Sequence, residues 1–310
     1  MNFILSADFW FSVLAGTTPV MLATLAANIV SQSGMFNLGI EGTMLMSALM
    51  GVLVSAFTQS LFLGMLAGLL SGIILSFALG YFTLYLEAPM NSVGVAINLF
   101  SAGVTVFVLT LITGSKVTSS SLTSLTFPAV HIPLIRDIPF LGRVLSGHNL
   151  ITYLGWIFAV GLSFLLYRTR LGLDIRATGR NAEAAASVGI QTNRVRFKAL
   201  LLCGIFCGFG GMYLSMGALK SFTANMVAGR GFLSLAMDTL SSSHPLLGWG
   251  GSLLYGFSET ITIYLQLYSD ADLKVISAFP YIFIILVLVI AQLARNLLVR
   301  RKKNIQLKGR

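Results

Sequence analysis

The chain has few charged residues and few cysteines, and both shortages exclude protein classes. Only 10% of its 310 residues are charged, whereas a soluble globular domain carries about 25%. Apolar residues make up 56%, and the mean hydropathy is +0.86, which excludes a disordered chain as well. Two cysteines cannot form a disulfide scaffold. Cys203 and Cys207 lie four apart in one apolar run and are expected to be small packing residues. An integral membrane protein remains.

Motifs for catalysis are also absent from the sequence. There is no HExxH, no GxSxG, no phosphate-binding GxxxxGK[ST] and no cluster of Cys and His. We therefore expect no enzyme, no metal site and no cofactor bound by this chain. Without a phosphate-binding loop, the chain alone should not hydrolyse ATP.

Long apolar runs predict membrane-spanning helices. A helical span needs about 20 mainly apolar residues, and these runs are unbroken rather than alternating as in a barrel strand. We expect an all-α, polytopic membrane protein with about nine spans, between eight and ten, in one domain over residues 1–310. No Lys or Arg precedes the first run, so we expect a retained span rather than a secretory signal. The runs cover residues 9–30, 35–57, 61–86, 93–113, 149–168, 198–217, 231–242, 246–268 and 279–298.

Basic residues predict which way the spans face. Fourteen of the twenty Lys and Arg flank the loop 169–197 or lie at the C-terminal end, where residues 299–310 form a basic tail. The positive-inside rule places both regions in the cytoplasm. This topology explains the net charge of +10 without nucleic acid, and the tail is also expected to contact anionic membrane lipid. Counting crossings back from the loop places the segment 114–148 and the N-terminus outside.

Parity constrains the last third of the chain. An even number of spans must separate the loop 169–197 from the tail, yet only three long runs lie between them. Either the short run 231–242 completes a fourth crossing, or one long run is re-entrant. Both alternatives put short or broken helix at membrane depth, near residues 229–242.

A second break is expected near residues 34–42, in the stretch SGMFNLGIEGTMLM. Glycines interrupt an apolar run there, and Glu41 is a carboxylate that is expensive to bury. Asn37 precedes it by four residues, so both would share a face of an intact helix. Glu41 either lines a translocation pathway or caps a helix by accepting buried backbone N–H groups, and both roles are compatible.

Other polar residues lie in apolar runs of the chain. Asp238 ends the stretch FTANMVAGRGFLSLAMD, in which Gly229 and Gly231 flank Arg230. Gly-interrupted segments in both halves are typical of a transport site. We expect Arg230 to extend toward the outer interface. Asn98 is expected to bond to a neighbouring helix, and a role in lining a pathway is the alternative.

Within the loop 169–197, the run NAEAAASVGI predicts a helix of about two turns. Asn181 is a good N-cap, Glu183 suits the helix dipole, and alanine is a strong helix former. Gly189 can end the helix in the left-handed conformation. Its small, shallow face suits insertion into a groove of another protein, although an ordinary connector would look similar.

Three runs resemble bacterial ABC-importer permeases of the branch that serves simple sugars, nucleosides and branched-chain amino acids. GLDIRATGRNAEAAASVGI resembles the coupling loop, and FNLGIEGTMLMSA (36–48) and NMVAGRGFLSLA (225–236) resemble two further signatures. The form NLGIEG is most similar to nucleoside-type permeases. The resemblance implies that the ATPase-coupling residues are Arg176, Gly179, Asn181, Glu183, Ala184, Ala185 and Gly189.

The resemblance also implies partners and a location. These are a cytoplasmic ATPase that uses ATP and Mg, a second permease subunit (a homologous or an identical chain) and an extracellular substrate-binding lipoprotein. The location is the bacterial plasma membrane. The cargo implied is a nucleoside, or alternatively a simple sugar such as ribose or a branched-chain amino acid. The pathway candidates are Phe36, Phe222 and Phe232 for stacking, Asn37, Asn98 and Asn225 for hydrogen bonds, and Glu41 and Asp238.

Two alternatives come from other classes. An ion-coupled secondary transporter would use Glu41 and Asp238 as ion ligands, but it would leave the Ala-rich cytoplasmic helix unexplained. A membrane enzyme would need clustered catalytic residues near one interface, and the sequence contains no such cluster.

Overall fold

The computed structural model describes residues 6–132, 138, 140–268 and 273–308, and within these ranges the chain is helical without a strand. Only two isolated β-bridges occur there, Thr118 with Thr223 and Ala129 with Asn149. The predicted all-α class is confirmed. The helices are α1 (Ala7–Gln32), α2 (Ile40–Thr58), α3 (Leu61–Leu84), α4 (Met90–Thr113), α5 (Leu141–Leu145), α6 (Leu150–Arg168), α7 (Arg170–Arg180), α8 (Ala182–Ser187), α9 (Thr192–Met212), the π-helix η2 (Tyr213–Ala218), α10 (Arg230–Ser241), α11 (Pro245–Tyr268) and α12 (Leu273–Lys308).

Each of the nine apolar runs forms a helix, but the nine differ in their capacity to span a membrane. Among the described residues, seven helices are long and apolar enough: α1, α2, α3, α4, α6, α9 continued by η2, and the part of α12 from Val275 to Leu293. The helix α11 has 24 residues but is less apolar, and α10 has only 12. The expected polytopic helical membrane protein is therefore confirmed.

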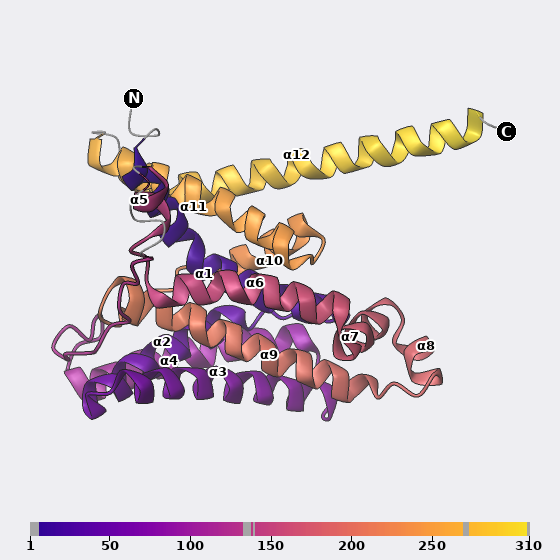
Figure 1. Ribbon diagram of the computed structural model, residues 1–310. Coiled ribbons are helices and arrows are strands. Elements are labelled where there is room, and N and C mark those ends of the chain that lie inside the picture. Colours follow the sequence, from indigo (N-terminus) through magenta and orange to yellow (C-terminus); the bar gives the residue numbers. More distant parts are fainter. Residues whose placement is uncertain (1–5, 133–137, 139, 269–272, 309–310) are drawn as a thin grey trace.

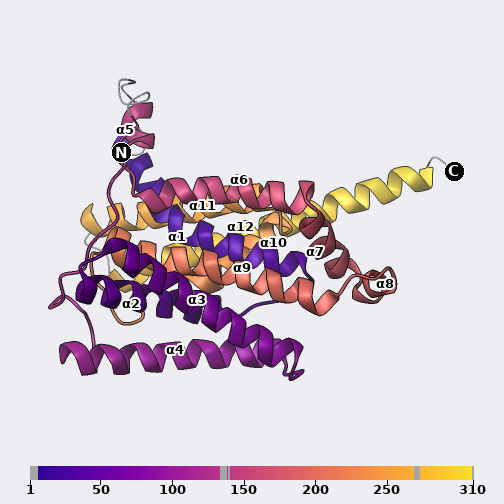
Figure 2. The same ribbon diagram turned by 60° about the horizontal axis from the view of Figure 1, so that its bottom comes forward.

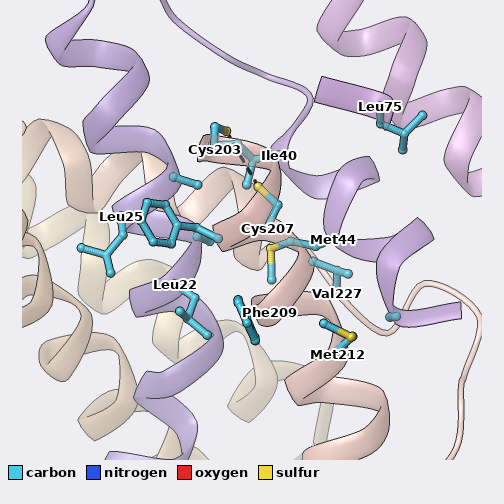
Figure 3. Packing of buried hydrophobic residues seen from close by; sticks show 14 of the residues in the cluster. Leu22, Leu25, Ile40, Met44, Leu75, Cys203, Cys207, Phe209, Met212 and Val227 are labelled. Atoms are coloured by element: carbon cyan, nitrogen blue, oxygen red, sulfur yellow. Dashed lines mark hydrogen bonds between the residues drawn. The ribbon is translucent and has the colours of Figure 1, made fainter. Parts of the chain in front are cut away.

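The helices run side by side along one direction, with α5 at one end and α7 and α8 at the other (Figures 1 and 2). Helices α1, α2 and α9 are mostly buried, whereas no more than a third of the apolar stretch of α3, α4, α6 or α12 is buried. Figure 3 shows side chains of this core, with Leu22 from α1, Met44 from α2 and Met212 from α9 packed together. The exposed outer helices present an apolar surface, as expected of a protein surrounded by lipid.

Small residues allow the central helices to approach closely. Along α3, Gly64, Gly68 and Gly72 repeat every four residues and lie on one face. That face packs against α2 and α9. A Cβ atom on Gly72 would lie 2.5 Å from the carbonyl oxygen of Gly204, which is too close for any larger residue. Such small-residue contacts replace the hydrophobic effect as the source of helix association in lipid.

The two ends of the bundle carry different elements. We call them the α5 end and the α8 end after the short helices located there. Helix α1 starts at the α5 end, and the connection from α4 to α6 also lies at this end (Figure 2). Helices α7 and α8 and the last turns of α12 lie at the opposite end (Figure 1). The segments predicted to be outside and those predicted to be inside thus lie at opposite ends.

The segment from 219 to 241 completes one crossing, which is the first of the two alternatives that parity left open. Its start pairs with the connection after α4 at the α5 end, because the backbone of Ala224 donates to Val117 at 2.8 Å. Its finish lies at the α8 end, where Gln32 at the end of α1 donates to the carbonyl of Ser243 at 2.9 Å. Non-helical backbone and the short helix α10 therefore together replace a full-length span.

Candidate functional site

The two interrupted segments meet inside the bundle. Residues 33–39 separate α1 from α2, and residues 219–229 separate η2 from α10. The start of α2 is bonded to Asn98, eight residues into α4, which is about 12 Å of helix at 1.5 Å per residue. Helix α2 therefore begins well inside the membrane-spanning region. Irregular backbone is tolerated at that depth only where protein buries it or a water-filled cavity solvates it.

Glu41 joins the two breaks. Its carboxylate oxygens accept hydrogen bonds from the backbone N–H groups of Gly229 and Gly231, each at 2.7 Å. These groups lie at the start of α10, where the helix dipole favours a negative charge. A Cβ on Gly231 would lie 2.7 Å from the Cα of Glu41, so this approach requires glycine. The structure shows the capping role of Glu41, while its contact with cargo stays a prediction.

Two asparagines predicted for the pathway hold the break before α2. The Asn98 side chain accepts from the backbone N–H of Gly42 at 2.7 Å and donates to the carbonyl of Leu38 at 2.8 Å. Asn37 accepts from the backbone N–H of Gly39 at 2.7 Å, and its amide donates to the Cys203 sulfur at 3.4 Å. The expected bond from Asn98 to a neighbouring helix is confirmed. The side-chain amides of Asn37 and Asn98, which were predicted to bind cargo, are therefore engaged in hydrogen bonds within the chain.

Asp238 fastens α10 to α1. Its two carboxylate oxygens accept hydrogen bonds from the Asn28 amide and the Ser31 hydroxyl, each at 2.6 Å. The aspartate side chain is buried. Such short bonds to a charged acceptor are among the stronger hydrogen bonds in proteins. Both carboxylate oxygens of Asp238 therefore take part in contacts that hold α10 against α1.

The side chain of Arg230 does not point where the sequence predicted. Instead of extending to the outer interface, its guanidinium forms an ion pair with Glu259 of α11 at 2.5 Å. Both side chains are about one-fifth exposed and line a cavity of about 400 Å³ between α1, η2, α10 and α11. The start of α10 is thus held from two sides, through its backbone by Glu41 on α2 and through the Arg230 side chain by Glu259 on α11.

The aromatic candidates divide into exposed and buried groups. Phe36 and Phe232 are 45% and 48% exposed, and Phe232 follows directly on the Gly231 that Glu41 caps. Asn225 is exposed in the break before α10, with a φ of 58°. Phe222, in contrast, is fully buried in the core. Phe36, Asn225 and Phe232 are therefore the sequence candidates with surface free to meet a small molecule in this chain.

The short helix of the loop 169–197 forms where it was predicted. Helix α8 covers Ala182–Ser187, and the Asn181 side chain caps it by accepting from the backbone N–H of Ala184 at 3.0 Å. Gly189 follows with a φ of 91°, the left-handed conformation expected of it. Glu183 and Ala184 are exposed, whereas Ala185 is buried within the chain.

Helix α7 was not predicted. Two of the predicted coupling residues lie on it, and both contact other parts of the same chain. Arg176 donates to the carbonyl of Leu166 at 2.9 Å, and its guanidinium lies 4.9 Å from the ring centre of Tyr167. Gly179 packs directly on the backbone at Gln32 and Gly34, where a Cβ would lie 2.9 Å from the Gly34 nitrogen. The loop helices therefore touch the break before α2 through a contact between two glycines.

Sequence reasoning missed three residues of this region. Glu259 is a carboxylate within the apolar run 246–268, and Asn28 is an amide within the run 9–30, so both could have been noted as expensive to bury. Val188 is 76% exposed directly after α8. An exposed apolar side chain beside a shallow helix is a signal for a partner surface.

Comparisons with known proteins agree with the resemblance. The family described as branched-chain amino acid transport system, permease component, matches residues 9–291. The guanosine ABC transporter permease protein NupQ of Bacillus subtilis is 31% identical over 291 residues, which is 89% of each chain. The nucleoside ABC transporter permease protein NupC of Lactococcus lactis is 26% identical and covers 89% of this chain and 90% of its own.

A relative that is named for a different substrate is also similar. The putative glucose ABC transporter permease protein TsgC13 of Haloferax volcanii is 28% identical over 81% of this chain and 76% of its own. No solved structure matches the chain.

Proposed function

The chain belongs to the family of branched-chain amino acid transport system permease components, and we propose that it carries nucleosides across the plasma membrane in an ATP-driven importer. Membership makes it a membrane permease of the ABC-transporter class, in the sugar and nucleoside branch. The observation that carries the nucleoside cargo is the 31% identity with the guanosine permease over 89% of both chains. The glucose permease relative makes a simple sugar the second candidate, and the family description keeps a branched-chain amino acid as a third.

Exposed aromatic rings support a nucleoside cargo. Phe36 and Phe232 are half exposed beside the two breaks, and a ring of this kind stacks on a planar base. Asn225 offers an exposed amide that can donate to or accept from ribose hydroxyls. We therefore narrow the proposed cargo contacts to these three residues. Glu41, Asn37 and Asn98 act as positioning residues that hold the breaks in shape.

Coupling to ATP would pass through the α8 end, which we assign to the cytoplasm. In this proposal α8, with Ala184 and Val188 exposed, docks in a groove of a separate ATPase that binds ATP and Mg. Movement of α8 displaces α7, and Gly179 of α7 presses on Gly34 in the break before α2. Glu41 then transmits the displacement from α2 to α10. A second permease subunit completes the pathway, and a surface lipoprotein delivers the nucleoside.

Uptake in proteoliposomes tests this function. The vesicles contain the full chain, its candidate partner permease and the ATPase, with the binding protein added outside. We expect ATP-dependent uptake of radiolabelled guanosine and uridine that exceeds uptake of glucose or ribose, and that falls in Phe232→Ala. Uptake of ribose or glucose alone would favour the second candidate. Uptake by this chain alone under an ion gradient, indifferent to ATP, would overturn the proposal and make Glu41 and Asp238 ion sites.

Copurification of the ATPase tests the docking surface separately. We expect Val188→Asp to abolish copurification, because it places a charge on the exposed apolar tip beside α8. The matched control is Val117→Asp, the same change at a residue 62% exposed at the α5 end. Retention of the ATPase by Val188→Asp, or its loss in both variants, would contradict docking through α8.

A further inference from the structure

A second cavity lies at the α8 end, and it includes Phe36, which is also one of the proposed cargo contacts. It has a volume of about 340 Å³, within the range of about 300–1,000 Å³ that small-molecule sites occupy. Three parts of the chain line it: the break before α2, the turn from α3 to α4, and the first turns of α9. Its lining includes Gly34, Phe36, Thr83, Asn91 and Arg196.

The cavity holds a positive charge without a paired carboxylate. The Nε atom of Arg196 donates to the carbonyl of Ser33 at 3.3 Å, which fixes the side chain. Among the residues that the structure describes, the one ion pair is Arg230 with Glu259 at the other cavity. The terminal nitrogens of the Arg196 guanidinium, which carry four N–H donors, have no hydrogen-bond partner in the described part of the chain. An uncompensated guanidinium of this kind favours a phosphate or a carboxylate.

The other lining groups narrow the ligand further. Asn91 adds an exposed amide, and Phe36 adds an aromatic ring that is 45% exposed. A guanidinium, an amide and a ring together suit a molecule with an anionic group at one end and a planar ring at the other.

We propose that this cavity binds a nucleoside monophosphate from the cytoplasm, and that its binding slows import. Arg196 would bind the phosphate, Phe36 would stack on the base, and Asn91 would bond to the ribose or the base edge. This ligand is the phosphorylated form of the proposed cargo, so the inference rests on the proposed function. A phospholipid head group and inorganic phosphate share the phosphate, but neither supplies a ring for Phe36.

The position of the cavity explains why binding would slow import. Gly34 lines the cavity on one side and packs against Gly179 of α7 on the other. A ligand held between Arg196 and Phe36 would fix the break before α2 against α7. That contact is the one through which movement of α8 reaches α2 in the proposed coupling. Accumulated monophosphate would thereby reduce import of its parent nucleoside.

Binding to the full-length permease in phosphatidylcholine nanodiscs tests the site directly. Isothermal titration calorimetry compares GMP with guanosine and with inorganic phosphate. We expect GMP to bind at least about tenfold more tightly than either, and Arg196→Gln to weaken GMP by about tenfold, since a charge-assisted bond to phosphate is lost. Arg194→Gln is the matched control, because that arginine is exposed on the same helix and does not line the cavity. It should leave the affinity for GMP unchanged.

Several outcomes would overturn the inference. If GMP binds no more tightly than guanosine, the phosphate does not contribute to binding. If Arg194→Gln and Arg196→Gln lose the same affinity for GMP, the ligand does not bind in the cavity. If phosphatidylglycerol in the nanodisc displaces GMP, the cavity is a lipid head-group site. If inorganic phosphate matches GMP, it is an anion site without selectivity for a base.

Uptake by the complete transporter tests the consequence. Guanosine uptake is measured in vesicles with GMP sealed inside and in vesicles without it, and each variant is compared with its own uninhibited rate. We expect internal GMP to inhibit uptake, and Arg196→Gln to raise the inhibitory concentration by about tenfold. Absence of uptake without GMP would count against the proposed function, whereas uptake that GMP does not change would count against this inference alone.

Discussion

Replacing Glu41 by glutamine tests the contact that joins the two breaks. The carboxylate accepts from the backbone N–H groups of Gly229 and Gly231, each at 2.7 Å. A glutamine carbonyl can keep one of these bonds, but its NH₂ group faces the other N–H group. That donor is then buried without an acceptor, which costs about 1–3 kcal/mol. The remaining bond also loses its charge assistance, so the free energy of unfolding should fall by about 2–4 kcal/mol in total.

The assay is a denaturation titration of the purified chain in mixed micelles, by increasing the fraction of sodium dodecyl sulfate. The change in the free energy of unfolding is measured for Glu41→Gln against the unmodified chain. Glu87→Gln is the matched control, because Glu87 is an exposed carboxylate at the turn from α3 to α4. An exposed substitution of that kind should change stability by less than about 0.5 kcal/mol.

One result would refute the reasoning. If Glu41→Gln unfolds like the unmodified chain but loses nucleoside uptake, the carboxylate serves the cargo and does not cap α10. If both stability and uptake fall, comparison with Gly231→Ala separates the two effects. The added Cβ of that variant would collide with Glu41 while leaving its charge in place. A similar loss of uptake in Gly231→Ala assigns the effect to the position of α10.

Three further predictions follow from the contacts. Gly179→Ala should lower ATP-driven uptake at least about tenfold in a folded protein, because its Cβ meets the backbone that ends α1. The control is Gly161→Ala, whose Cβ meets nothing within 4 Å and which should leave uptake unchanged. Asp238→Asn should lower the free energy of unfolding by about 1 kcal/mol. Asn28→Asp should lower it more in the same titration, because it places two carboxylates next to each other. Equal decreases in the free energy of unfolding would contradict this. Burial lowers the pKa of His148 from its ordinary 6.5, so the unfolded chain takes up a proton at a higher pH than the folded chain. Stability should therefore be full above pH 6.5 and fall as the pH drops below it, but not in His148→Gln; identical pH profiles would refute this.

Features with local signals were predictable from the sequence. Helix α8 follows from Asn181 as N-cap, the alanine run and Gly189 as terminator, all within nine residues. The break before α2 follows from glycines beside Glu41 in an apolar run. Parity restricted the region of residues 229–242 to two alternatives, a short crossing or a re-entrant long run, because charged loops fix the side on which each end must lie.

Features that depend on distant partners were not predictable. Helix α7 contains two glycines, and it is held by contacts that the local sequence does not encode, such as Arg176 on the end of α6. The partner of Glu41 lies 188 residues away, and no pattern near Glu41 indicates the start of α10. Arg230 was expected to extend toward the outer interface, but Glu259 of α11, 29 residues further along the chain, lies within reach of its guanidinium and forms an ion pair with it.

The contacts around α10 imply which helices move together during transport. Its start is held by Glu41 of α2 and, through Arg230, by Glu259 of α11, while Asp238 near its finish is held by Asn28 of α1. Separating α10 from α1 or α2 would leave a buried carboxylate without its hydrogen-bond donors, at a cost of about 1–3 kcal/mol for each unsatisfied group, and separating it from α11 would break the ion pair of Arg230 with Glu259. Helices α3, α4 and α6 make no comparable charged contact with α10 among the described residues. We therefore infer that α1, α2, α10 and α11 move as one body, so that a displacement of Gly34 by α7 shifts both breaks at once.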